Sequence, residues 1–367
     1  MLHAVIMAGG SGTRFWPASR RLTPKQLLPL VGEESMIAQT AARFGDLAPP
    51  ERRMVVTNRR LVDAVRGQLP ELPAANIVGE PCKRDTAPCI GLAALLVTRV
   101  AKDPEATMLV CPADHVIPDI EAFQDSVNRA VELVEGSPNK IVTFGIPPTY
   151  PAEIFGYIKS NRMDLDPDMP MFADGPVAFA VEEFREKPDA ATAAEYVRSG
   201  DYYWNSGIFV WRAATILDAL RERQPEMLAH LEKIVDAWDG PDRDAVFDRE
   251  FERIKGVSID YAVMEHATDI AVIPAPFEWD DLGGWQSLQR RLGEDENGNT
   301  IVGRHIGVDT TGAIVRTGDE HLVVTLGVKD TIVVHTGNAT LVANKHDEES
   351  IRKVVKELER LGWDDFL

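Results

Sequence analysis

Short apolar runs alternate with amphipathic stretches over the first 145 residues of the chain. Apolar or β-branched runs, typical of strands in a buried parallel sheet, occur at 4–7, 53–57, 76–78, 106–111 and 140–144. Apolar side chains recur at helical spacing in 121–135, and Asp85 and Thr86 are candidate N-caps for a second helix over 86–100. This alternation predicts an α/β fold with a right-handed, mostly parallel, Rossmann-like sheet.

The pattern becomes mixed after residue 146. Strand-like pieces are expected at 156–159, 177–184 and 207–211, and helices at 213–223 and 225–238. We interpret this part as an insertion that completes the same domain. Short β-branched pairs recur over 300–343 and predict a small β module, for which an incomplete β-helix is one candidate. A terminal helix is expected to end at Gly362. We therefore predict one domain over 1–290 and a small β-rich domain over 291–367.

The charge balance limits the classes of partner. The chain has 39 basic and 58 acidic residues, a formal net charge of −19, which argues against nucleic-acid and anionic-membrane surfaces. Its longest apolar stretch, 87–97, is too short to span a bilayer, and the first strand leaves no room for a signal peptide. The three cysteines lack metal or disulfide spacing. These features favour a cytoplasmic location with reduced thiols.

The first strand runs directly into a glycine-rich segment, Gly9-Gly10-Ser11-Gly12-Thr13. Glycines allow the backbone to approach a ligand closely and to turn N–H groups toward an anion. Four cations precede Glu33, the first carboxylate of the chain: Arg14, Arg20, Arg21 and Lys25. An ordinary glycine-rich turn explains the glycines but leaves this acid-free cationic segment unexplained. A polyphosphate ligand explains both.

Two familiar phosphate-binding motifs do not fit this segment. The dinucleotide fingerprint requires a third glycine where Phe15 stands. The nucleotide-hydrolase loop requires a Gly-Lys-Ser/Thr sequence that is absent. The phosphate site must therefore be of another kind.

The segment resembles the signature of sugar-nucleotide pyrophosphorylases, in which a glycine-rich loop carries an arginine and is followed by Pro-Lys. Here these residues are Gly10, Gly12, Arg14, Pro24 and Lys25. Further matches over residues 1–290 are GEPCKRDTAP (79–88), CPADH (111–115), FGYI (155–158), EKP (186–188), WNSGIF (204–209), SIDYAVME (258–265) and WDDLGGW (279–285). Within that family the set is most similar to the mannose-1-phosphate guanylyltransferases, also called GDP-mannose pyrophosphorylases.

The resemblance implies that residues 1–290 form a nucleotidyltransferase catalytic domain. The activity that the resemblance implies is transfer of GMP from GTP to α-D-mannose 1-phosphate, with release of GDP-mannose and pyrophosphate. The implied reaction is a magnesium-dependent in-line attack without a covalent intermediate. A phosphate monoester is already a sufficient nucleophile at neutral pH, so none of the eight histidines needs a role. The expected partners are GTP, mannose 1-phosphate and, because the family often forms dimers, a second copy of the chain.

The resemblance also implies which residues act on the phosphates and the metal. Asp114 and Asp281, rather than Asp280, match metal-binding aspartates and would hold Mg²⁺. Arg14 would stabilise the leaving pyrophosphate and Lys25 the α-phosphate region. Lys187 would position the sugar phosphate. Without the family, Asp114 is better explained as a turn or helix-capping aspartate, and His115 as its structural neighbour.

Substrate-binding residues are implied in the same way. The nucleotide would contact Ala8, Gly9, Gly10, Ser11, Gly12, Thr13, Glu80, Arg84 and Thr86, and the sugar phosphate Gly156, Tyr157, Glu186 and Asn205. The carboxylate of Glu80 could accept hydrogen bonds from the N1–H and the 2-amino group of guanine. Alternatively Glu80 is a surface glutamate, Glu186 and Lys187 a solvated pair, Asn205 a turn residue, and Tyr157 a core residue.

Three alternatives to this function remain open at this stage. The chain could use another nucleotide, another sugar 1-phosphate (glucose, fucose or a heptose), or act as a catalytically silent nucleotide-sugar sensor. Both metal carboxylates are retained together with the catalytic cations, which weighs against a sensor. Some bacterial relatives carry a fused phosphomannose isomerase domain. Because this sequence ends at Leu367, we expect transferase activity alone.

Overall fold

Two units make up the part of the chain that the computed structural model describes, namely residues 1–10, 12–165, 175–318 and 320–367. Unit 1 comprises Met1–Gly9, Thr40–Ala113 and Ile117–Trp279. Unit 2 comprises Gly10–Gln39, Asp114–Val116 and Asp280–Leu367. The glycine-rich loop therefore groups with the C-terminal part of the chain rather than with the strand that precedes it. No helix in the described residues is both long and apolar enough to cross a bilayer.

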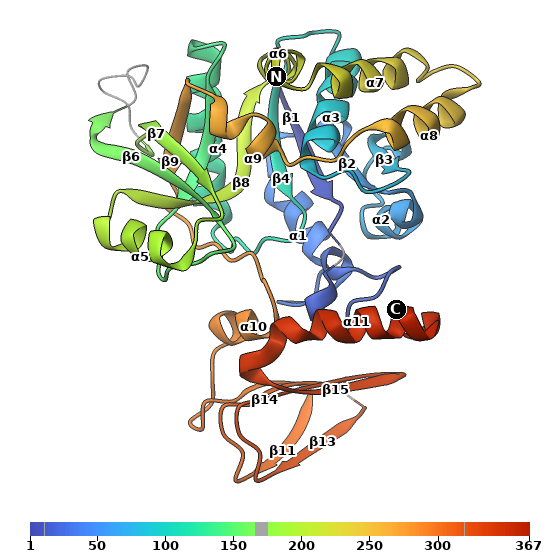
Figure 1. Cartoon of the computed structure of the whole chain (residues 1–367), viewed down its shortest axis with the longest axis vertical. Helices are drawn as coiled ribbons and strands as arrows, with labels where there is room; N and C mark the ends of the chain where they lie inside the picture. The colour runs from blue at the N-terminus through green and yellow to red at the C-terminus, as the bar shows by residue number, and fades with distance from the viewer. Residues whose placement is uncertain (11, 166–174, 319) are drawn as a thin grey trace. The chain divides into compact units, whose positions relative to one another are not determined.

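A sheet of nine strands, among the described residues, forms the centre of unit 1 (Figure 1). Its strand order is β3-β2-β1-β4-β8-β5-β9-β7-β6. The strands are β1 (Leu2–Ala8), β2 (Arg53–Asn58), β3 (Ile77–Glu80), β4 (Thr107–Pro112), β5 (Ile141–Ile146), β6 (Gly156–Leu165), β7 (Phe179–Glu186), β8 (Tyr202–Arg212) and β9 (Ile270–Pro274). Neighbours among β3, β2, β1 and β4 are parallel, which confirms the predicted parallel arrangement for these four strands.

The inserted residues complete this sheet rather than forming a separate layer. β8 lies between β4 and β5 and is antiparallel to both, and β7 is antiparallel to β6 and β9. Val5 of β1 is paired with Met54 and Val110, and all three side chains are buried. This burial explains why the first strands read as continuous apolar runs.

Helices cover the sheet of unit 1, and several of them share an apolar cluster with its strands (Figure 1). They are α2 (Val62–Gln68), α3 (Thr86–Ala101), α4 (Ile120–Gly136), α5 (Ala190–Ser199), α6 (Ala213–Arg223), α7 (Pro225–Asp236), α8 (Arg243–Arg253) and α9 (Ile259–Ala262). α3, α4, α6 and α7 were predicted. The N-cap of α3 is confirmed, because Asp85 accepts a hydrogen bond from the Thr86 N–H at 2.9 Å. The helix α1 (Met36–Arg43) contains the point along the chain, between Gln39 and Thr40, at which a unit 2 segment ends and a unit 1 segment begins.

The C-terminal part of unit 2 is a short parallel β-helix closed by a helix (Figure 1). β10 (Thr300–Val302), β12 (Ile314–Arg316) and β14 (Thr331–Thr336) form one parallel ladder, to which β15 (Ala339–Asn344) adds in antiparallel orientation. β11 (Arg304–Val308) and β13 (Leu322–Leu326) form a second parallel pair. Successive parallel coils confirm the predicted incomplete β-helix.

One apolar cluster joins the N-terminal and C-terminal segments of unit 2. Phe15 and Trp16 pack in the same cluster as Trp285 of α10 (Trp285–Leu292) and as Ile351 and Leu358 of α11 (Ile351–Leu361). The rings of Phe15 and Trp285 pack edge to face, with their centroids 5.1 Å apart. α11 ends at Gly362 in the left-handed conformation (φ 69°), as predicted. Residues that are far apart in the sequence are thereby fixed around a single core.

Candidate active site

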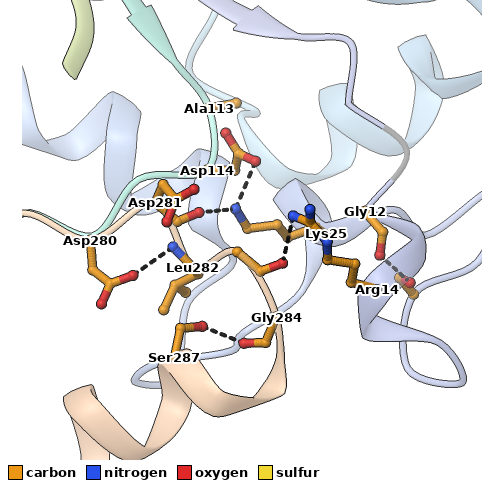
Figure 2. A network of polar contacts seen from close by, with 12 residues as sticks. Gly12, Arg14, Lys25, Ala113, Asp114, Asp280, Asp281, Leu282, Gly284 and Ser287 are labelled. Atoms are coloured by element: carbon orange, nitrogen blue, oxygen red, sulfur yellow. Dashed lines mark hydrogen bonds and ion pairs between the residues drawn. The ribbon is translucent and has the colours of Figure 1, made fainter. Parts of the chain in front are cut away.

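A pocket within unit 2 brings together six of the residues that the sequence selects (Figure 2). It is lined by Gly12, Thr13, Arg14, Phe15, Lys25, Asp114, His115, Asp281, Leu282 and Gly283. Three chain segments contribute: the glycine-rich loop with its Pro-Lys extension, the residues after β4, and the loop before α10. The charged groups of the pocket are two cations and two carboxylates, with His115 beside them.

Lys25 connects the three segments of the pocket. Its side chain is only 7% exposed, and its ammonium group donates to Asp114 Oδ2 at 2.8 Å and to the carbonyl oxygen of Asp281 (Figure 2). Gly12 has a φ of 57°, and a Cβ at this position would lie 2.8 Å from the backbone nitrogen of Lys25. Gly12 is therefore required for the close approach of Lys25 as well as for the turn.

Arg14 lies on η1 (Thr13–Phe15), the turn that follows the glycine-rich loop. Its Nη1 donates to the carbonyl oxygen of Gly283 at 3.1 Å, and its Nη2 forms an ion pair with Glu349 Oε1 at 2.7 Å. Arg14 Nε is buried and has no hydrogen-bond partner among the described residues. The guanidinium group is thus held at two nitrogens and still has N–H groups for an anion.

Adjacent Asp280 and Asp281 have different surroundings. Both carboxylate oxygens of Asp280 contact Arg290, at 3.0 and 3.2 Å, and Asp280 Oδ1 also accepts the Leu282 N–H at 2.8 Å. Asp281 instead lines the pocket, and its backbone carbonyl accepts from Lys25. Leu282 between Asp281 and Gly283 has a φ of 44°, an uncommon conformation for leucine. Asp280 therefore binds Arg290, whereas the neighbouring Asp281 lines the pocket.

The two pocket carboxylates differ in their pKa values. Burial raises the pKa of Asp281 to about 6, opposed by Lys25 and reinforced by the negative charges of Asp280 and Asp114. Burial would also raise the pKa of Asp114, but Lys25 and His115 outweigh it and lower that pKa below its usual value. The burial of Asp281 and the negative charge of Asp114 near it are electrostatic conditions that a bound cation would relieve.

Glu348, on η8 (Lys345–Ser350), supports the same loop from the C-terminal side. α10 begins after Gly284, which has no side chain to cap it, and Glu348 Oε2 accepts the Gln286 N–H at 3.0 Å instead. A Cβ on Gly284 would lie 2.8 Å from the Glu348 carboxyl group, so a larger residue would displace this cap. The loop that carries Asp281 thus depends on a distant glutamate.

Replacing Glu348 with alanine is expected to lower the free energy of unfolding by about 1 kcal/mol, because the first turn of α10 loses its capping acceptor. The measurement is urea denaturation followed by tryptophan fluorescence. Glu357→Ala serves as a control. Glu357 pairs with Arg360 on the exposed face of α11, so its removal should leave stability almost unchanged. Equal midpoints for Glu348→Ala and Glu357→Ala would contradict the capping role.

Arg20 and Arg21 lie outside this pocket, although they belong to the same acid-free segment. Arg20 donates to the carbonyl oxygens of Pro17 and Phe366 and to Asn338. Arg21 pairs with Asp364 at 2.6 Å and with Glu359 at 3.2 Å. Two of the four cations therefore fix the C-terminal segment, so a phosphate ligand explains only Arg14 and Lys25.

A second polar cluster lies in unit 1 and contains most of the predicted sugar-phosphate residues. The side chain of Glu186 is 7% exposed and forms an ion pair with Lys187 at 2.6 Å. A Cβ on Gly156 would lie 2.6 Å from Glu186 Oε2 and 3.4 Å from the Asn205 Cβ, so the three positions are neighbours. Burial alone would lower the pKa of Lys187, but the pairing with Glu186 raises it. Lys187 has a φ of 46°, a second uncommon backbone conformation at a candidate residue.

Asp260, which we did not select from the sequence, belongs to this cluster. Its Oδ1 accepts from Asn205 Nδ2 at 3.0 Å. Burial, with the nearby charge of Glu186, raises the pKa of Asp260 to about 7, and Lys187 opposes this shift. The adjacent Ile259 N–H donates to Thr86 Oγ1 at 2.8 Å, so the start of α3 lies beside the cluster. Asp260 lies within the SIDYAVME match, so the sequence did mark the segment that contains this residue.

Tyr157 occupies the core of unit 1. Its ring is fully buried, and its hydroxyl group donates to the Ala152 carbonyl oxygen at 2.9 Å. The ring centroids of Tyr196 and Tyr202 lie 5.2 and 6.5 Å from that of Tyr157. This placement favours the core interpretation of Tyr157 over direct contact with a sugar.

The remaining predicted nucleotide residues are distributed over both units. Glu80 ends β3 and is 7% exposed, burial raises its pKa to about 8, and its Oε1 has no hydrogen-bond partner among the described residues. Arg84 donates to the backbone oxygen of Glu252. Ala8 and Gly9 are the last residues of the first unit 1 segment, and Gly10 is the first residue of unit 2. Ser11 lies outside the described residues.

Comparisons with known proteins identify relatives of this chain. A family model described as nucleotidyl transferase matches residues 3–297, and one described as a MannoseP isomerase/GMP-like beta-helix domain matches residues 303–358. A mannose-1-phosphate guanylyltransferase of Salmonella typhimurium is 41% identical over 365 residues, which are 98% of this chain and 74% of the relative. A protein of the same name from Escherichia coli is 40% identical over 366 residues, with the same two coverages.

A solved structure resembles the chain over nearly its full length. The crystal structure of a protein from Thermus thermophilus, described as a mannose-1-phosphate geranyltransferase, has a TM-score of 0.83 and 33% sequence identity. The likeness covers 98% of this chain and 99% of that one. With the nucleotidyl transferase match and the long alignments to curated relatives, it shows that this chain belongs to the mannose-1-phosphate guanylyltransferase family of nucleotidyl transferases.

Proposed function

We propose that this protein transfers GMP from GTP to α-D-mannose 1-phosphate and releases GDP-mannose and pyrophosphate. The observation that carries the proposal is the pocket of unit 2, in which Arg14 and Lys25 face the same space as Asp114 and Asp281. Curated relatives at about 40% identity bear the name of this activity. A pocket with paired cations and carboxylates suits a substrate that combines phosphates with a metal ion.

The cations of the pocket would lower the barrier by holding the triphosphate and by countering its negative charge as the sugar phosphate attacks. Arg14 is assigned to the leaving pyrophosphate because its planar donors match phosphate oxygens and its Nε is free of protein partners among the described residues. Lys25 is assigned to the α-phosphate region, where its charge would counter the charge developing at the attacked phosphorus. The phosphate of the sugar is the nucleophile, so no general base is required.

Asp114 and Asp281 are the residues that would hold a magnesium ion. The donor set fits, because Mg²⁺ is commonly bound by one or two carboxylates and completes its shell with water and substrate phosphates. No cluster of three or more metal-ligating side chains occurs in the part of the chain that the structure describes, so the triphosphate would supply the remaining ligands. When bound, the ion would supply positive charge that neutralises triphosphate oxygens.

The polar cluster of unit 1 is assigned to the sugar phosphate. Glu186 and Asn205 have the acceptor and donor groups that sugar hydroxyls require, and Lys187 would hold the phosphate of mannose 1-phosphate. Asp260 would orient the Asn205 amide through their 3.0 Å hydrogen bond. The length of the family matches supports our assignment of residues 1–290 to the catalytic domain and 291–367 to the C-terminal domain.

Glu80 is assigned to guanine, and its buried state leads to a test. At neutral pH a carboxyl group with a pKa of about 8 is mostly protonated, whereas acceptance of the guanine N1–H and 2-amino hydrogens favours the ionised form. Binding of GDP-mannose near pH 7 is therefore expected to release a proton. Affinity is expected to rise with pH up to about 8, by about tenfold per pH unit.

Titration calorimetry in buffers of different ionisation enthalpy measures this proton release directly. GDP-mannose is the ligand of choice because it has no group of its own that titrates near neutral pH. Glu80→Gln should abolish both the proton release and the pH dependence. An unchanged proton release in Glu80→Gln would show that another group ionises, and would remove the reason for assigning Glu80 to the base.

A substrate matrix tests the proposed function as a whole. Pyrophosphate release is measured with GTP, ATP, UTP and dTTP, each combined with the 1-phosphates of mannose, glucose, fucose and a heptose in the presence of Mg²⁺. GTP with mannose 1-phosphate is expected to give the highest kcat/KM. A maximum at another pair would reassign the substrate, and the absence of turnover with every pair would favour a silent sensor.

A further inference from the structure

We propose that Glu349 of the C-terminal module is a positioning residue for Arg14, so that the module takes part in the transfer reaction. The proposal rests on the role of Arg14 in the proposed function. Glu349 lies on η8, immediately before α11, more than three hundred positions after the arginine that it contacts. Its Oε1 is 2.7 Å from Arg14 Nη2, and the two residues belong to the same unit.

The contacts of Arg14 divide its N–H groups into two sets. Gly283 accepts from Nη1 at 3.1 Å and Glu349 pairs with Nη2. A guanidinium group has five N–H donors in a rigid plane, so two fixed contacts define its orientation and leave three donors for a ligand. The buried Nε, which has no partner among the described residues, is one of these three.

The held guanidinium lies beside the candidate metal carboxylate. A Cβ on Gly283 would be 3.8 Å from Arg14 Nη1 and 3.6 Å from Asp281 Oδ2, so one small residue separates the two groups. Losing the Glu349 contact would leave Arg14 with one anchor among the described residues, at Nη1, about which its plane can rotate. Arg14 is assigned to the leaving pyrophosphate. If its guanidinium plane is no longer aligned, the rate should fall more than substrate binding weakens.

The exposure of Glu349 shows how a carboxylate is tolerated at a phosphate site. Its side chain is 61% exposed, whereas that of Arg14 is 18% exposed, so the negative charge lies at the solvent side of the pair. Its second oxygen is 3.6 Å from Arg352, which offsets part of the charge. Solvent screening further weakens its repulsion of an incoming triphosphate.

The test is a double-mutant cycle on pyrophosphate release from GTP and mannose 1-phosphate. Glu349→Ala is expected to lower kcat by about tenfold with little change in the KM for mannose 1-phosphate. Glu349→Gln should recover most of this loss, because its amide oxygen still accepts from Nη2. In an Arg14→Ala background, Glu349→Ala should cause no further loss, because the residue acts only through Arg14.

Controls separate this role from a general effect on folding. Arg352→Gln removes the outer partner of Glu349 but leaves its contact with Arg14, and should keep kcat within about twofold of wild type because exposed ion pairs contribute little. Melting temperatures of the variants should stay close to that of the wild type.

Several outcomes would overturn the proposal. These are wild-type kcat for Glu349→Ala, an equal loss in the Arg14→Ala background, or a gain in activity, which would mean that Glu349 competes with the triphosphate for Arg14. If Arg14→Ala itself retains wild-type kcat, the role proposed for Arg14 fails first. If Arg14→Ala is impaired and Glu349→Ala is not, only the positioning role fails.

Discussion

Arg14→Ala is expected to lower kcat by about 10²–10³ while changing the KM for mannose 1-phosphate by no more than a fewfold. The side chain lines the pocket and keeps free N–H donors, so its removal eliminates stabilisation of the charge that develops on the leaving pyrophosphate. A donor whose contact strengthens in the transition state affects turnover more than substrate binding. Steady-state kinetics of pyrophosphate release, with each substrate varied in turn, measures both parameters.

The chain offers a matched control for this substitution. Arg21 belongs to the same cationic segment, but it pairs with Glu359 and Asp364 near the surface rather than lining the pocket. Arg21→Ala should therefore keep kcat close to the wild-type value. Turnover of Arg14→Ala within a fewfold of wild type would remove Arg14 from the chemical step, and equal losses in both variants would indicate a general effect of charge.

Asp281→Asn is expected to raise the Mg²⁺ concentration that gives half-maximal activity by at least about tenfold. The substitution removes a carboxylate from the pocket but preserves the backbone carbonyl that accepts from Lys25, so the loop should keep its position. Asp280→Asn should change the Mg²⁺ requirement only weakly, because the Asp280 carboxylate is already engaged by Arg290 and the Leu282 N–H.

The two variants are compared by titrating Mg²⁺ at saturating GTP and mannose 1-phosphate, with melting temperatures measured in parallel. Asp280→Asn should lose stability, because it weakens an ion pair whose acidic partner is only 8% exposed. A larger change in the Mg²⁺ requirement for Asp280→Asn than for Asp281→Asn would show that our proposal assigns the metal to the wrong aspartate.

Much of the fold could be predicted because buried strands and amphipathic helices have distinct patterns. β1 and β4 are continuous apolar runs, and the terminal helix has regular apolar positions. α8 escaped prediction because Phe247 and Phe251 are the large buried residues of an otherwise strongly charged segment. The grouping of residues 10–39 with the C-terminal module was equally hidden, because it depends on packing of Phe15 and Trp16 against distant side chains.

The site was predictable only where resemblance supplied the link between distant segments. Lys25 and Asp114 are 89 positions apart, and no local spacing indicates that their side chains meet. Acidic residues before a helix, such as those before α11, are ordinarily explained by favourable charge at the helix start. Their actual contacts, from Glu348 to α10 and from Glu349 to Arg14, follow from tertiary packing that local sequence rules do not represent.

The wide spacing of the pocket residues along the chain has a consequence for biosynthesis. Gly12, Lys25, Asp114, Asp281 and Glu349 come from early, middle and late parts of the translated sequence. Contacts of such high sequence separation form slowly, and a growing polypeptide lacks the later partners until they have been synthesised. The contact that orients Arg14 should therefore be missing in a nascent chain until the segment that carries Glu349 has emerged from the ribosome exit tunnel.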